Sequence, residues 1–160
     1  KFSKIISIEP NPLLCQRIKD NLSLLAKKNS EIEDKVVIEN YAIGNESNDS
    51  YLSLARGYGN ASITQESNIT SIKVQMTPLL NLIKKNNIES IKTLKIDIEG
   101  YEDVALIPYF ENVKETLFPK NIIIESGSHQ LWGQDVIKFL FSKGYKELFK
   151  TKSNVILSNK

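Results

Sequence analysis

The sequence predicts a doubly wound α/β domain, in which helices cover a mostly parallel sheet and a C-terminal antiparallel hairpin completes it. Short β-branched runs alternate with segments of helical periodicity along most of the chain, which is typical of a parallel sheet with crossover helices. The last two strand-like segments, 145–150 and 154–158, are close enough in sequence to form a hairpin. For 160 residues, 41% hydrophobic and 25% charged, we expect a single domain over residues 1–160.

The first predicted unit is a strand followed by a helix. The β-branched run at residues 5–8 is stopped by two prolines, which suits a buried parallel strand that ends in a turn. Apolar residues keep helical spacing from Pro12 to about Lys28, and Asn11 is expected to cap this helix. A second strand is predicted over residues 36–41.

The middle of the chain predicts a hairpin-like excursion. Residues 51–55 and 71–76 alternate in polarity with a period of two, and they flank a loop that contains Gly57-Tyr58-Gly59. No helical pattern follows this triplet, so we expect a flexible loop near the site and not a dinucleotide-binding turn. A helix is predicted from about Pro78 to Asn87, because lysines and a terminal asparagine favour its end.

The second half of the chain continues the strand and helix order. A strand ending in "KIDIEG" precedes a helix over about 101–112, which Pro108 is expected to kink or stop. A continuous β-branched strand at 121–126 and a helix at about 134–142 follow before the closing hairpin.

Composition and charge argue against several classes of function. The 21 basic and 19 acidic residues are well mixed and give a net charge of +2, so no polybasic face for nucleic acid is expected. Cys15 is the one cysteine, which excludes an internal disulfide and fits a reducing compartment. No apolar run approaches the ~20 residues of a membrane span and no signal-peptide pattern is present, so we expect a cytoplasmic location.

Polar residues mark the expected ends of the parallel strands. Ligands of doubly wound sheets bind beyond the carboxyl ends of the strands, so these residues are predicted to share one rim of the sheet. They are Glu9, Asn40, Tyr41, Asp97, Glu99 and Glu125.

Asp97 and Glu99 are the strongest candidates at this rim. Side chains alternate along a strand, which would place both carboxylates on one side, and such clusters of acids are typical of functional sites. Two structural alternatives remain open: an ion pair of Asp97 with Lys95, and capping of the following helix by Glu99. Glu102 is expected to be mainly structural, because an acid in the first turn of a helix favours the helix dipole.

The segment "LKIDIEGYE" resembles the signature of the FkbM family of S-adenosylmethionine-dependent methyltransferases. Upstream, "SIEPNP" is similar to that family's second strand and acidic turn, and "ENYAIGNES" to its third strand and exit. "NIIIES" and the helix that ends in "SKGYKEL" resemble its last core units. The resemblance covers nearly the whole chain, and it implies a Rossmann-like class I methyltransferase fold with S-adenosyl-L-methionine as cofactor.

The resemblance also implies where the cofactor would lie. The Glu9 carboxylate would accept hydrogen bonds from the ribose diol, with an acid favoured at a helix start as the structural alternative. Adenine would lie at the exit of the 36–41 strand, where a buried Tyr41 at a strand end is the alternative. The expected cofactor contacts are Glu9, Asn11, Asn40, Tyr41, Ala42 and Asp97.

The implied reaction is transfer of a methyl group to a hydroxyl of a small molecule, sugar or glycan. This chemistry needs a base for the hydroxyl proton and an aligned acceptor. Asp97 is expected to be the base or the group that positions the acceptor, and Glu99 to support it. His129 is either a general base near the end of the 121–126 strand or a solvated loop residue, and no metal is predicted.

The sequence departs from the family in one respect. The family's first strand and glycine-rich turn would lie just before Lys1, so the chain is expected to be truncated at its N-terminus relative to the family. It would then be a fragment of a longer enzyme or a natural truncation. The alternative function is a non-catalytic Rossmann-like domain that acts as a binding or interaction module.

Overall fold

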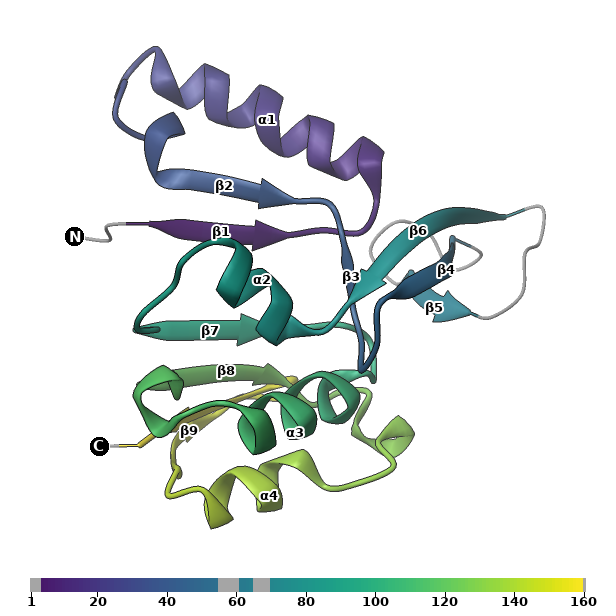
Figure 1. The fold of residues 1–160 in the computed structure, drawn as a ribbon, viewed down its shortest axis with the longest axis vertical. Coiled ribbons are helices and arrows are strands. Elements are labelled where there is room, and N and C mark those ends of the chain that lie inside the picture. The colour runs from purple at the N-terminus through teal and green to yellow at the C-terminus, as the bar shows by residue number, and fades with distance from the viewer. Residues whose placement is uncertain (1–3, 55–60, 65–69, 160) are drawn as a thin grey trace. The chain divides into compact units, whose positions relative to one another are not determined.

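The computed structural model describes residues 4–54, 61–64 and 70–159, which form a mixed α/β structure (Figure 1). The helices are α1 (Pro12–Ala26), α2 (Leu79–Lys85), α3 (Glu102–Asn112) and α4 (Val136–Ser142), with the 3₁₀ segments η1 (Glu33–Lys35), η3 (Glu115–Leu117) and η4 (His129–Leu131). The strands are β1 (Ile5–Ile8), β2 (Val36–Glu39), β3 (Ala42–Ile43), β4 (Asn48–Ser53), β5 (Ser62–Thr64), β6 (Ser71–Thr77), β7 (Thr93–Ile96), β8 (Asn121–Glu125), β9 (Lys146–Lys150) and β10 (Asn154–Ser158).

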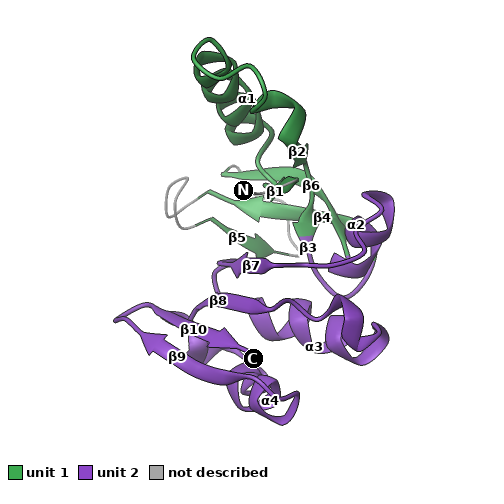
Figure 2. Ribbon diagram, turned by 90° about the vertical axis from the view of Figure 1, so that its left-hand side faces the viewer, with its two compact units in different colours: residues 1–42, 47–77 green, residues 43–46, 78–160 purple. Residues whose placement is uncertain are grey.

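The chain divides into two compact units (Figure 2). Unit 1 comprises residues 1–42 and 47–77, and unit 2 comprises residues 43–46 and 78–160. The single domain expected from the sequence stays a prediction. Among the described residues, no helix combines the length and the apolar character that crossing a membrane requires.

Unit 1 opens with the predicted strand and helix. β1 pairs with β2 in parallel, with Ile5 opposite Val36. Asn11 is the N-cap of α1, with Pro12 in the first turn, as the sequence predicts. A second sheet has the order β3-β6-β4-β5, in which β4 pairs antiparallel with β5 and β6. The predicted hairpin-like excursion is therefore confirmed, whereas Gly57-Tyr58-Gly59 lies outside the described residues.

The core of this second sheet is small and apolar. Ala42, Leu52, Val74 and Met76 are buried together, because the alternating residues of β4 and β6 place their apolar side chains on one face.

Unit 2 contains a sheet of order β7-β8-β10-β9. β7 and β8 are parallel, and β10 is antiparallel to both β8 and β9, so the closing hairpin is confirmed. Ile122 and Ile124 of β8 and Val155 and Leu157 of β10 are fully buried, and helices α3 and α4 contribute the equally buried Leu106 and Leu140. α3 runs through Pro108 to Asn112, so this proline does not end the helix.

The parallel pairs β1–β2 and β7–β8 and the antiparallel hairpin agree with the mixed α/β class that the sequence predicts. Among the described strands these pairs belong to separate sheets, so a single doubly wound sheet stays a prediction.

Candidate functional site

In unit 1, Glu9 follows β1 at the start of the Pro-Asn-Pro turn. Its backbone N–H continues the parallel ladder by donating to the carbonyl of Glu39 at 3.0 Å. Its carboxylate Oε1 accepts the backbone N–H of Asn11 at 2.7 Å. Among the described residues, no donor contacts Oε2. The turn therefore fixes one oxygen of this carboxylate, and the described residues supply no donor to the other.

Partial burial of Glu9 raises the pKa of its carboxyl, and the hydrogen bond from the Asn11 amide offsets part of this effect. The charged form of Glu9 is therefore less well solvated than that of a surface glutamate. A ligand that brought hydroxyl donors to Oε2 would relieve this cost.

Asn11 and Asn40 stabilise the turn that carries Glu9. Asn11 is 1% exposed, and its Oδ1 accepts the amide of Leu13 at 3.0 Å. Its buried Nδ2 has no hydrogen-bond partner within the described ranges. Asn40 follows β2, and its Nδ2 donates to the carbonyls of Glu9 at 2.9 Å and Pro10 at 2.8 Å. The exits of the two parallel strands are therefore joined by one side chain.

A cavity of about 420 Å³ lies beside these strand exits, within unit 1. Two residues that line the cavity, Asp49 and Lys73, form an exposed ion pair at 2.7 Å. Its lining residues are Pro10, Pro12, Asn40, Asp49, Lys73, Val74 and Gln75. Tyr41 is half-buried, whereas the side chain of Ala42 lies in the core.

In unit 2, β7 ends at Ile96, earlier than the sequence pattern indicates. Asp97 and Glu99 therefore lie in the turn that follows, and the alternation of side chains along a strand does not apply to them. Glu99 and Gly100 adopt φ values of 56° and 98°, in the region that L-residues rarely occupy. Glycine is suited to the second of these positions because it lacks a Cβ.

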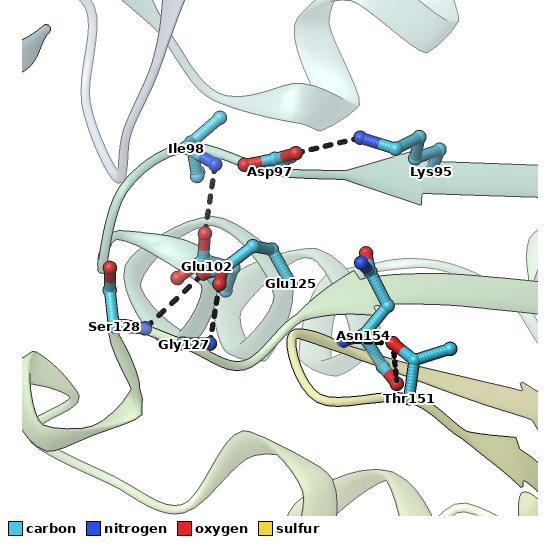
Figure 3. A network of polar contacts seen from close by, with 9 residues as sticks. All are labelled: Lys95, Asp97, Ile98, Glu102, Glu125, Gly127, Ser128, Thr151 and Asn154. Carbon is cyan, nitrogen blue, oxygen red and sulfur yellow. Dashed lines mark hydrogen bonds and ion pairs between the residues drawn. The ribbon is translucent and has the colours of Figure 1, made fainter. Parts of the chain in front are cut away.

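Asp97 forms the ion pair that the sequence left open as an alternative. Its Oδ2 lies 2.8 Å from Nζ of Lys95, and the two side chains are 40% and 58% exposed, respectively (Figure 3). Solvent can therefore reach the Asp97 carboxylate. Sequence reasoning places Asp97 and Glu99 together in a candidate catalytic role, and the structure keeps them within one short turn.

Glu102 is the acid whose importance the sequence pattern did not reveal. It is 0% exposed, and its Oε1 accepts the amide of Ile98 at 2.8 Å (Figure 3). Its Oε2 accepts the amide of Gly100 at 3.1 Å and the indole N–H of Trp132 at 2.7 Å. Helix-dipole reasoning predicts an acid here but gives no reason to bury it. No local signal connects Glu102 to a tryptophan thirty residues later.

The segment after β8 is held by similar contacts. Glu125 accepts the amides of Gly127 and Ser128, the second at 3.3 Å, as Figure 3 shows. His129 is exposed, and its Nδ1 lies 2.7 Å from the carbonyl oxygen of Ser126. An Nδ1–H donor in this contact would leave Nε2 as the acceptor of the neutral ring.

The candidate residues thus form two groups. Glu9, Asn11 and Asn40 lie together in unit 1, next to Tyr41 and Ala42 in the chain. In unit 2, Asp97 and Glu99 lie in the turn after β7 and Glu102 begins α3, whereas Glu125 ends β8 and His129 begins η4.

Comparisons with known proteins identify the family of the chain. The family model described as the methyltransferase FkbM domain matches residues 3–147. The chain is similar to the crystal structure of a methyltransferase FkbM from Methylobacillus flagellatus KT, with a TM-score of 0.63 and 15% sequence identity. This match covers 99% of the chain and 37% of that protein, and at this identity it shows the fold alone. No curated protein matches the chain.

Proposed function

Because the chain belongs to the methyltransferase FkbM domain family, we propose that it takes part in methyl transfer from S-adenosyl-L-methionine to a hydroxyl of a small molecule or carbohydrate. The Rossmann-like doubly wound sheet and the single domain expected from the sequence are part of this proposal. The parallel pairs β1–β2 and β7–β8 support it.

The observation that carries the proposal is the state of the Glu9 carboxylate. It is half-buried at the end of a parallel strand, its Oε1 is held by Asn11, and its Oε2 has no donor among the described residues. A ribose diol offers two O–H donors to one carboxylate, which matches the unused acceptor capacity of Glu9. The unpartnered Nδ2 of Asn11 adds a donor in the same turn.

The neighbouring cavity suits the adenine part of the cofactor. Its volume of about 420 Å³ falls within the usual range for small-molecule sites, and Asn40 lines it. Tyr41 follows Asn40 directly and is proposed to lie against the base. Because the Ala42 side chain is in the core, its contact would come from the backbone.

The bound cofactor would supply an activated methyl group on a sulfonium. The chain itself must orient the acceptor and take the proton from its hydroxyl. We assign proton removal or acceptor positioning to Asp97, with Glu99 in support, because both lie in the turn after β7 and the Asp97 carboxylate is exposed. Asp97 is also proposed to contact the cofactor.

Titration calorimetry with S-adenosylhomocysteine tests the cofactor assignment without knowledge of the acceptor. We expect binding to the wild-type chain and at least a tenfold weaker affinity for Glu9→Ala. Asp20→Ala is the matched control, because it removes one exposed acid from α1 and leaves the strand exits intact. An equal affinity of the two variants would refute the role of Glu9.

A non-catalytic binding or interaction module is the second candidate. The chain spans 37% of the length of the similar methyltransferase. The same titration separates the two candidates, since the absence of heat at millimolar S-adenosylhomocysteine would support the module and overturn the cofactor assignment.

A further inference from the structure

The turn after β7 and the segment after η4 are joined by the buried side chain of Glu102. Two of its three donors, the amides of Ile98 and Gly100, belong to the turn that carries Asp97 and Glu99. The third, the Trp132 indole N–H, belongs to the segment beyond β8. Both carboxylate oxygens are therefore used, and each donor is neutral.

Two further contacts fasten the same pair of segments. Asp103 is 6% exposed, and its Oδ2 accepts the amides of Gly133 at 2.8 Å and Gln134 at 3.1 Å. Leu131 lies against Gly100 so closely that a Cβ on this glycine would be 2.7 Å from Leu131 Cδ1. Residues 131–134 thus contact residues 97–103 at three separate places.

A role in helix stability alone does not explain this arrangement. An acid in the first turn of a helix already interacts favourably with the helix dipole at an exposed position, so the dipole alone does not require burial. Burial of a carboxylate without a cation is costly unless its hydrogen bonds are satisfied, and no lysine, arginine or histidine in the described part of the chain pairs with Glu102. The Glu102 carboxylate instead accepts hydrogen bonds from the amides of the turn that contains Glu99 and Gly100 and from the indole of Trp132.

We propose that Glu102 is a positioning residue, which acts with Trp132 to hold the turn of Asp97 and Glu99 and the His129–Gln134 segment in one fixed arrangement. This inference rests on the proposed function in one respect, namely that the turn of Asp97 and Glu99 faces the acceptor. Acceptor-side groups from the ends of β7 and β8 are then presented together, and loss of the indole bond releases the turn.

The variant Trp132→Phe tests this proposal, because it removes the indole donor and keeps an aromatic ring at a half-buried position. Tyr109→Phe is the matched control, since it removes one hydroxyl donor, to the Leu117 carbonyl at 2.7 Å, from the same unit. We expect similar falls in melting temperature. Only Trp132→Phe should shift the carboxyl ¹³C signals of Asp97 and Glu99 in the folded protein. Only this variant should also raise the exchange rates of the amides of residues 98 and 100, by about tenfold.

A second measurement needs no variant. Trp132 is the only tryptophan in the chain, so its indole N–H gives a single assignable signal. We expect this proton and the amides of Ile98 and Gly100 to exchange with the same opening equilibrium, as groups of one cooperative unit do.

Two results would overturn the proposal. One is an unchanged set of Asp97 and Glu99 signals in Trp132→Phe despite a lower melting temperature, which would make the bond merely stabilising. The other is an indole proton that exchanges independently of the two amides. Both measurements use the ligand-free chain, so failure of the S-adenosylhomocysteine titration would leave them informative about Glu102 alone.

Discussion

The substitution Gly100→Ala should expose two separate energetic terms in the turn after β7. The φ of 98° at this position is unfavourable for any residue with a Cβ, by roughly 1–2 kcal/mol. The new Cβ would also lie 2.7 Å from Cδ1 and 2.9 Å from Cβ of Leu131. Forcing a methyl group into such a contact costs about 1–3 kcal/mol. The free energy of unfolding should therefore fall by about 2–5 kcal/mol.

A double-mutant cycle separates the two terms. Leu131→Gly removes all three Leu131 atoms that the new methyl would meet, whereas Leu131→Ala leaves Cβ in place. Because Leu131 is 63% exposed, its own loss should be modest. The steric term of about 1–3 kcal/mol should then appear as a favourable coupling in Gly100→Ala/Leu131→Gly, and only in part with Leu131→Ala.

Thermal or urea unfolding of the four proteins of each cycle measures this coupling. A melting temperature lowered by about 2–4 °C for each kcal/mol is expected in a chain of this size. Additive losses, with no coupling between the two positions, would refute the close packing of Leu131 on Gly100. Full recovery of stability in the double variant would refute the backbone term.

Two further predictions concern the candidate acids. Asp97→Asn should lower the free energy of unfolding by no more than about 1 kcal/mol, since the ion pair of Asp97 with Lys95 is exposed. The same variant should abolish methyl transfer in the complete protein. Lys95→Gln removes the same ion pair, so it should lower the free energy of unfolding equally and retain methyl transfer. If the residual activity of Asp97→Asn followed the fraction of folded protein, the Asp97 carboxylate would have a structural role only. Glu9→Gln should be more stable than wild type at neutral pH, because burial raises the pKa of Glu9 and the ionised form is penalised. This gain should vanish at acidic pH, where both proteins are neutral at residue 9; a gain that does not depend on pH would contradict the assignment.

Much of the local structure was predictable because it depends on neighbouring residues. The β-branched run at 5–8 forms β1 with the predicted bounds, and the Asn11-Pro12 pair starts α1 because capping and a fixed proline φ are local effects. The closing hairpin follows likewise from two short runs and a tight connection.

The candidate site was predictable only in part. Sequence alternation extends the charged strand to Glu99, but the chain leaves the strand after Ile96 and adopts a positive φ at Glu99. A non-glycine residue in this region is uncommon, and local propensity does not foresee it. The turn depends on the buried acceptors of Glu102, whose third donor comes from Trp132. Contacts between segments so distant in sequence leave no periodic pattern.

The acids at the strand ends differ in how many acceptor sites the chain itself fills. Glu125 and Glu9 both accept the amide two residues ahead, so the turns after β8 and β1 share a local motif. Glu125 uses its second oxygen for Ser128, whereas the second oxygen of Glu9 has no donor in the described part of the chain. Glu102 uses both oxygens for three donors, and Asp97 pairs, among the described residues, only with the exposed Lys95. A carboxylate oxygen that accepts no hydrogen bond within the folded chain can accept one from a ligand. This difference supports the proposed roles of Glu9 in binding and of Asp97 in reaction, whereas the carboxylates of Glu102 and Glu125 are occupied by backbone amides of unit 2.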